Sequence, residues 1–389
     1  MDFTIPERTG RFRSELAELF GKRSVRDLLA RVAAREDGMD GDVREVFRVL
    51  GAAGALAPAW PAEYGGRGGD FTETIALLEE LVRYRIPSSL YYISVQIIGS
   101  LILQSGTHEQ KKTILPRLAS GELSACILFT EPDNGSDLAG ITTRARREGS
   151  EWVIDGHKKY NLKTAYADLA LCAARIDDAA SRYEGITLFL LPMSTPGITV
   201  KPIPSMADEQ FHDVRLDGVR VTDDAVFGDP GAGWSLITRL FSAERSGLDY
   251  YARGLNWMRL SAESLACDGA AGDAEAAGLA RRWARLDASR LLASRVMQRL
   301  QDDEPDIIQA SLSKWHCSES AQRVAWWALE TLGLPMVTTF PADADRALEA
   351  AYREAAGLTI SGGASEVLLE VVAGARLLGD VPDDRERSR

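Results

Sequence analysis

A short polar turn that follows an apolar run is the part of this 389-residue sequence with the clearest capacity for chemistry. Residues 125–129 are apolar, and residues 130–137 include Thr130, Pro132, Gly135 and Ser136. Such a run predicts a buried strand that ends in a sharp turn. Two hydroxyls and a glycine at that turn can approach a phosphate or the edge of a heterocycle, because glycine has no Cβ in the way. The same residues suit an ordinary tight turn, so the pattern alone leaves both interpretations open.

The stretch around this turn has the hydrophobic period of a β-sheet. From residue 124 to about residue 228, short segments rich in β-branched residues alternate with polar ones. Several short strands at this spacing predict a small β-barrel or sandwich. Asp155-Gly156 is predicted to be the two-residue turn of a hairpin between two of the strands.

Helical periodicity precedes and follows the β-rich stretch. Phe12, Leu16 and Phe20 fall on one face of a helix, and Asp70 with Glu73 predicts a capping box at the start of another. After about residue 231 the helical pattern returns, with breaks that leave three or four long helices. Such helices are expected to pack as a four-helix bundle.

A chain of this length is too long for one simple core. We therefore predict an α+β multidomain fold, with a helical domain over residues 1–120, a β domain over residues 121–230 and a helical bundle over residues 231–389.

Composition narrows the class of partner. A formal net charge of -12 and a pI near 5.0 argue against nucleic acid or an anionic membrane surface. The longest apolar run, residues 90–103, is shorter than the roughly 20 residues of a membrane span. No apolar signal sequence opens the chain, and its four cysteines form no Cys-x-x-Cys pair. These features predict a cytoplasmic protein without a metal site.

Further motifs stand on both sides of the polar turn, in one order along nearly the whole chain. They are Glu-Tyr-Gly-Gly at 63–66, Gly-Thr-His-Glu-Gln-Lys at 106–111, Thr-Glu-Pro at 130–132, Gly-Ser-Asp at 135–137, Gly-His-Lys at 156–158, Gly-Ala-Gly-Trp at 231–234, Glu-Arg at 244–245 and Gly-Ala-Ser-Glu at 363–366. Together they resemble the flavin-dependent acyl-CoA dehydrogenase superfamily. The resemblance implies FAD as cofactor, an acyl thioester on CoA or a carrier protein as substrate, and a homodimer or homotetramer.

The resemblance also implies α,β-desaturation, in which a carboxylate takes the α-proton of the thioester while the β carbon delivers hydride to the flavin. In the family the carboxylate occupies one of two places. The commoner place corresponds to Gly362, beside Ser361, and neither residue can act as a base. The place used by isovaleryl- and long-chain-type members corresponds to Glu244, which is the candidate base. Glu131 and Glu366 are the competing acids, and a plain surface pairing of Glu244 with the arginine that follows it is the alternative.

The same match implies the residues that hold FAD. Phe129 and Thr130 would lie along the isoalloxazine edge, Gly135 and Ser136 near the pyrophosphate, and Tyr160 would cover the ring where the family usually has Trp or Phe. The alternative is that Tyr160 is an ordinary strand residue with its hydroxyl at the surface.

Two candidate positions depart from the family pattern. Leu162 stands where a threonine hydroxyl usually approaches flavin N5, and Gly333-Leu334 replaces the usual Gly-Gly near the FAD phosphates. Three hypotheses therefore stay open: an FAD-dependent dehydrogenase that desaturates an acyl thioester, an oxygen-using oxidase of a carrier-bound intermediate, and a redox-inactive thioester- or flavin-binding homologue. An electron-transfer flavoprotein is a candidate partner, and the residues do not identify the electron acceptor. The residues do not identify the acyl chain.

Overall fold

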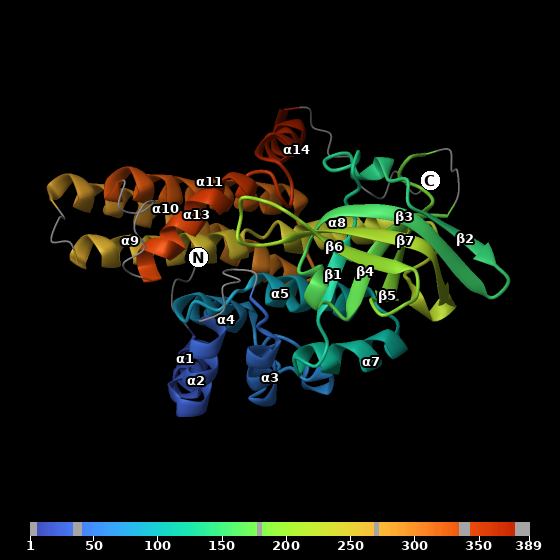
Figure 1. Cartoon of the computed structure of the whole chain (residues 1–389), viewed down its shortest axis with the longest axis horizontal. Coiled ribbons are helices and arrows are strands. Elements are labelled where there is room, and N and C mark those ends of the chain that lie inside the picture. The colour runs from blue at the N-terminus through green and yellow to red at the C-terminus, as the bar shows by residue number, and fades with distance from the viewer. Residues whose placement is uncertain (1–5, 34–40, 177–180, 268–271, 334–342, 378–389) are drawn as a thin grey trace. The chain divides into compact units, whose positions relative to one another are not determined.

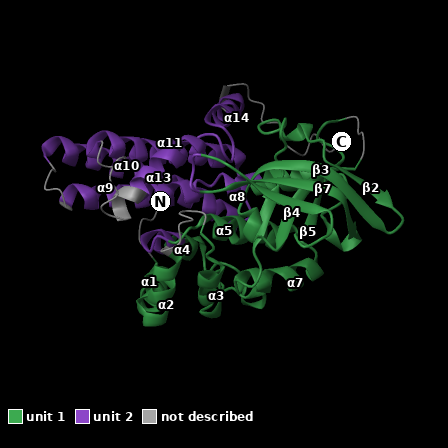
Figure 2. Ribbon diagram, viewed as in Figure 1, with its two compact units in different colours: residues 1–77, 86–205, 209–240 green, residues 78–85, 206–208, 241–389 purple. Residues whose placement is uncertain are grey.

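The computed structural model describes residues 6–33, 41–176, 181–267, 272–333 and 343–377 (Figure 1). The chain forms two compact units, coloured separately in Figure 2. The first unit comprises residues 1–77, 86–205 and 209–240, and the second comprises residues 78–85, 206–208 and 241–389.

The N-terminal part of the chain is helical, as the sequence predicts. Its helices are α1 (Glu7–Gly21), α2 (Arg23–Ala33), α3 (Arg44–Ala52), α4 (Phe71–Arg83), α5 (Ser89–Tyr91), a π-helix (Tyr92–Gly99), α6 (Ser100–Ser105) and α7 (His108–Ala119). The predicted apolar face of α1 is confirmed, because Phe12, Leu16 and Phe20 are buried.

At the start of α4, Asp70 caps the helix as predicted, whereas Glu73 bonds to another helix. The carboxylate of Asp70 accepts a hydrogen bond of 2.8 Å from the backbone N–H of Thr72, so Asp70 satisfies one of the free donors of the first turn. The Glu73 carboxylate instead accepts from Arg8, at 3.0 Å from its Nε. The acid at the third position of the turn therefore ties α4 to α1.

Eight strands form one sheet in the first unit (Figure 1). They are β1 (Ala125–Leu128), β2 (Arg144–Glu148), β3 (Glu151–Leu162), β4 (Leu169–Arg175), β5 (Ile186–Pro192), β6 (Ile198–Ile203), β7 (Phe211–Thr222) and β8 (Val226–Phe227). The order is β6-β7-β3-β2-β4-β5-β8, and β1 pairs in parallel with β4. The pairs β3–β7, β4–β5 and β6–β7 are antiparallel, as hairpin-rich β domains require.

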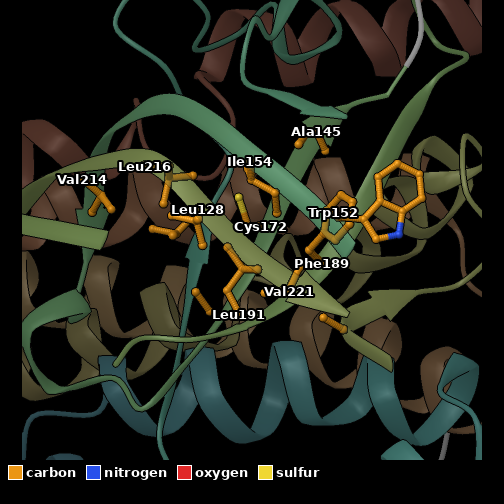
Figure 3. Close-up of a cluster of buried hydrophobic side chains, with 14 of the residues drawn as sticks. Leu128, Ala145, Trp152, Ile154, Cys172, Phe189, Leu191, Val214, Leu216 and Val221 are labelled. Atoms are coloured by element: carbon orange, nitrogen blue, oxygen red, sulfur yellow. The ribbon is translucent and has the colours of Figure 1, made fainter. Parts of the chain in front are cut away.

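The core of the sheet is built from strand residues that point to one side (Figure 3). Alternate positions of each strand share a face, so β3 contributes Trp152 and Ile154 while β4 contributes Cys172. The ring of Trp152 meets that of Phe189 edge-on, with centroids 5.8 Å apart. These contacts fix the ends of β1 and β3, from which the candidate flavin residues project.

The predicted hairpin at Asp155-Gly156 is wrong. Strand β3 continues through these residues, with a shift of its register against β7 between Ile154 and Gly156. The turn between β2 and β3 lies at 149–150, where Gly149 has a φ of 65°. Gly156 is needed for space rather than for a turn, because a Cβ there would lie 2.3 Å from the hydroxyl of Thr143. Asp155 accepts a 2.7 Å hydrogen bond from the backbone N–H of Gly218 on β7.

The second unit contains the predicted bundle. Helix α8 (Gly233–Glu244) runs into it, followed by α9 (Leu248–Cys267), α10 (Asp273–Gln301), α11 (Ile307–Leu332), α13 (Asp343–Leu358) and α14 (Ser365–Leu377). Helices α9, α10, α11 and α13 pack on one another, so the four-helix bundle is confirmed. The break predicted after residue 301 is also present, with Asp306 capping α11 through Ile308 and Gln309 N–H, each at 3.0 Å. Breaks predicted at 268–269 and 334–335 lie outside the described residues.

None of the helices in the described ranges is long and apolar enough to cross a membrane.

Candidate functional site

The first part of the candidate site is the turn that follows β1. Two backbone hydrogen bonds close it, from Glu131 N–H to Asn134 carbonyl at 3.1 Å and from Asn134 N–H to Glu131 carbonyl at 3.2 Å. Beyond the turn, Gly135 and Ser136 are exposed, and nothing lies within 4 Å of a Cβ built on Gly135. At the predicted pyrophosphate position, the backbone of Gly135 and the side chain of Ser136 are therefore exposed.

A buried ion pair holds this turn in place. The Glu131 carboxylate accepts hydrogen bonds from Lys158 Nζ at 2.9 Å, from Thr142 N–H at 2.6 Å and from Thr143 N–H at 2.8 Å. Burial raises the pKa of Glu131, but the Lys158 charge and these hydrogen bonds outweigh burial and lower it to about 2. Glu131 is therefore a structural carboxylate whose oxygens are already bonded, which removes it as a competing base.

Strand β3 brings a second flavin candidate beside the turn. The N–H of Lys159 donates to the Thr130 carbonyl at 2.9 Å, so the half-buried Thr130 and the strand residue Tyr160 lie side by side. Tyr160 is 52% exposed, and its ring meets that of Phe211 edge-on at a centroid distance of 6.5 Å. The Lys159 ammonium lies 5.2 Å from the centroid of this ring, so the exposed ring also has a cation beside it.

Backbone strain accompanies this exposed ring. Tyr160 has a φ of 60° and Lys163 a φ of 59°, a region that side-chain-bearing residues rarely adopt. The register between β3 and β7 shifts between Lys158 and Asn161, so the strand bulges at Tyr160. Strain of this kind costs of order 1–3 kcal/mol per residue and concentrates at binding sites. Leu162 follows on the same strand, half-buried and paired with Phe211.

The first unit therefore brings Thr130 and Tyr160 together, with Gly135 and Ser136 on the adjoining turn. The Phe129 side chain is buried, and its carbonyl accepts a hydrogen bond from Lys158 Nζ at 3.0 Å. An open glycine backbone, an exposed hydroxyl and an exposed aromatic ring fit the phosphate and ring ends of FAD. Bound FAD would supply the hydride acceptor for an oxidation.

Glu244 lies in the second unit, at the end of α8. Its carboxylate is half-buried and faces the turn between α13 and α14. A Cβ built on Gly362 would lie 3.5 Å from Glu244 Oε1 and 2.8 Å from the Tyr250 hydroxyl oxygen. Glu244 and Gly362, the two positions that the family resemblance indicated for the base, are thus neighbours in space within this unit, and of these two residues Glu244 carries a carboxylate.

The surroundings of Glu244 are charged and buried. Burial raises the pKa of Glu244, opposed by the positive charges of Arg245 and Lys314. Arg245 donates from Nε to the Gly362 carbonyl at 3.3 Å and stacks on Phe241, with its guanidinium carbon 4.4 Å from the ring centroid. A carboxylate whose pKa is raised by burial and opposed by two nearby cations is a candidate general base.

Glu366 does not compete for this role. It lies exposed in the first turn of α14, where a carboxylate favours the helix N-terminus. The sequence analysis missed Lys314 and Tyr250, which contact the turn that packs on Glu244. A lysine among small and apolar residues of a helix is a signal that could have been found, because a lysine is seldom fully buried without a partner.

Gly333 ends α11 with a φ of 71°, and its N–H donates to the Leu329 carbonyl at 2.9 Å. Lys314, near Glu244, lies on the same helix 19 residues earlier, which is about 28 Å along the axis. The structure therefore does not bring Gly333 to the Glu244 end of the bundle within one chain.

Comparison of the chain with known families gives the class of protein, an FAD-dependent, acyl thioester dehydrogenase-like flavoprotein. Family models for the N-terminal, middle and C-terminal domains of acyl-CoA dehydrogenase match residues 11–122, 126–219 and 231–377. The chain belongs to the acyl-CoA dehydrogenase family.

Relatives extend over most of the chain. Acyl-CoA dehydrogenase IpdE1 of Mycobacterium tuberculosis is 29% identical over 337 residues, covering 85% of this chain and 86% of that protein. The human mitochondrial short-chain specific acyl-CoA dehydrogenase is 29% identical over 338 residues, covering 84% and 80%. The solved structure "Tcur3481-Tcur3483 steroid ACAD" has a TM-score of 0.84 and 32% identity, covering 98% of this chain and 99% of that one.

Proposed function

We propose that this chain desaturates an acyl thioester at the α,β position, with Glu244 as the base that takes the α-proton. The observation that supports the proposal is the closeness of Glu244 to Gly362, since a Cβ built on Gly362 would lie 3.5 Å from Glu244 Oε1. The raised pKa of Glu244 supports the same role, because a stronger base accepts a proton from a weak carbon acid more readily.

We infer that FAD binds the first unit through Phe129, Thr130, Gly135, Ser136 and Tyr160. Tyr160 offers a ring face, Thr130 and Ser136 offer hydroxyls, and Gly135 offers open backbone. Leu162 contributes an apolar surface rather than a hydroxyl donor.

The experiment that tests the function starts from the visible spectrum of the purified protein. A yellow protein with bound flavin that bleaches anaerobically on addition of an acyl thioester supports the dehydrogenase. Bleaching followed by rapid recovery in air, without an electron-transfer flavoprotein, would instead indicate the oxygen-using oxidase. Bound flavin that no thioester bleaches would indicate the redox-inactive homologue.

We propose a bulky, ring-containing acyl group on the thioester. The support for this is the solved relative titled "Tcur3481-Tcur3483 steroid ACAD", which is 32% identical to this chain. The discriminating measurement is kcat/KM for a steroid-derived acyl-CoA against that for butyryl-CoA. A preference for butyryl-CoA would contradict this substrate class, and carrier-protein thioesters belong in the same panel.

We also propose that the active form is an oligomer, a homodimer or homotetramer, whose bundle supplies Gly333 to the FAD of a neighbouring subunit. The distance along α11 between Gly333 and Lys314 supports this, because within one chain Gly333 lies far from the Glu244 end of the bundle. Two solved relatives carry paired names, Tcur3481-Tcur3483 and ChsE4-ChsE5, so a second, different chain is the alternative partner. Light scattering of the purified chain, alone and with FAD, decides between a self-assembled oligomer and a monomer that awaits a partner.

Two finer points belong to the same proposal. The limits of the family models support three domains that meet near residues 120 and 230. A location in the cytoplasm, where CoA thioesters are formed and consumed, and an electron-transfer flavoprotein as acceptor complete the proposed function.

A further inference from the structure

A fully buried lysine lies behind the turn that packs on Glu244. Lys314, on α11, has an exposed fraction of 0%. Its ammonium donates to the Leu358 carbonyl at 3.0 Å and to the Gly363 carbonyl at 2.8 Å. These carbonyls stand at the two ends of the turn between α13 and α14, so one side chain fixes both ends of that turn.

The middle of the same turn is held from another side. The hydroxyl of Tyr250, on α9, donates to the Ser361 carbonyl at 3.1 Å, and Lys314 Nζ lies 4.9 Å from the centroid of the Tyr250 ring. A cation at this distance from a ring face is attracted to it. Lys314 therefore steadies the turn directly and also through Tyr250, and the turn presents Gly362 to Glu244.

Charge links the two groups as well as geometry. Burial lowers the pKa of Lys314 to about 7, and the Glu244 charge opposes that lowering. The effect is reciprocal, because the Lys314 charge lowers the pKa of Glu244. The other titratable or charged groups that act on Lys314 are Arg245 on the chain following α8, and Glu319 and Cys317 on α11.

We propose that Lys314 is a positioning residue for the base: its ammonium holds the turn against Glu244 and supplies the positive charge that favours the ionised carboxylate. The inference rests on the proposed role of Glu244. The lysine does not touch the reacting atoms. Lys314 acts on the position of the Glu244 carboxylate and on its protonation state.

A direct test needs no substrate. In protein labelled with ¹³C at lysine Cε, the Lys314 resonance is assigned by its loss in Lys314→Arg, and its titration is followed between pH 5 and 9. We expect a midpoint near pH 7. Glu244→Gln removes the carboxylate that favours the ammonium, so the midpoint should move to lower pH. An unchanged midpoint in Glu244→Gln would overturn the proposed coupling.

The kinetic test uses the pH dependence of anaerobic flavin bleaching. Lys314→Met removes the cation, so the pKa of Glu244 rises and the acid limb of the profile should move to higher pH. Lys314→Arg keeps the charge and should leave the limb near its wild-type position. A Lys314→Met profile that superimposes on the wild type would contradict the proposal.

A matched control separates positioning by charge from plain structural support. Gln322 lies two turns further along α11, is buried, and donates to the Ala355 carbonyl at 3.0 Å and to the Thr359 hydroxyl at 3.4 Å. Gln322→Leu should lower the melting temperature without moving the acid limb. If it moves the limb as much as Lys314→Met, Lys314 is only a structural anchor. Bleaching of Glu244→Gln at the wild-type rate would refute the base itself, whereas the lysine titration still decides the coupling.

Discussion

Replacing Glu244 with glutamine tests the proposed chemistry most directly. Glutamine keeps the length and planar end of the side chain, so the packing beside Gly362 is retained while the base is lost. Removing a general base typically costs roughly 10² to 10⁴ in rate, which corresponds to about 2.7 to 5.4 kcal/mol in the barrier. We expect the rate of anaerobic flavin bleaching to fall within that range, with the flavin spectrum unchanged.

The substitution has an electrostatic effect that must be separated from the chemical one. The Glu244 charge opposes the desolvation of both Lys314 and Arg245, so its removal lowers the pKa of Lys314 further below its usual value. Stability should therefore be measured alongside the rate, by thermal unfolding with FAD present. A large fall in melting temperature would assign part of the lost activity to misfolding.

Glu366→Gln is the matched control for this experiment. It makes the same chemical change at an exposed acid in the first turn of α14. We expect it to bleach at the wild-type rate. The assignment of the base fails if Glu244→Gln, folded and yellow, bleaches as fast as Glu366→Gln.

The structure makes three other predictions. Ser136→Leu should remove a donor and crowd the phosphate end of FAD, and an FAD dissociation constant equal to that of the wild type would show that the cofactor is misplaced. Gly362→Ala should lower the melting temperature, because its φ of 65° strains an alanine and the new Cβ would lie 2.8 Å from the Tyr250 hydroxyl; an unchanged melting temperature would argue against this geometry. The stability that Glu131 contributes should be complete above about pH 4.5 and lost as the pH falls towards 2, since its pKa is lowered on folding. The difference in urea midpoint between wild type and Glu131→Gln should accordingly shrink between pH 5 and pH 3, and a constant difference would contradict it.

Local patterns in the sequence were sufficient for the order of the elements. The alternation of residues 141–200 predicted the strands, and the spacing of Phe12, Leu16 and Phe20 predicted a buried helix face. Both patterns depend only on neighbours along the chain, which is why they could be used without a structure. The hairpin at Asp155-Gly156 failed because the same dipeptide also fits inside a strand when a partner, here Thr143, needs the space.

The site was harder to predict because its determinants are distant in sequence. Glu244 was found only through the family resemblance, and nothing local distinguishes it from a surface glutamate. The role of Glu131 depends on Lys158 and Thr142, and that of Lys314 on carbonyls 44 and 49 residues away. The strained backbone of Tyr160 accompanies the bulge between β3 and β7. The residue types around Tyr160 do not predict that bulge.

The topology of the sheet determines when the chain can fold during synthesis. Strand β1 pairs with β4, 44 residues later, β3 pairs with β7, and β5 pairs with β8, so the sheet is incomplete until about residue 227 has been made. Until then β5, which is buried along nearly its whole length, lacks its edge partner β8. Non-local pairing is slow, and exposed apolar strands of this kind aggregate. Expression at low temperature, with chaperones that bind nascent chains, should therefore raise the yield of soluble protein more than changes to the helical bundle would.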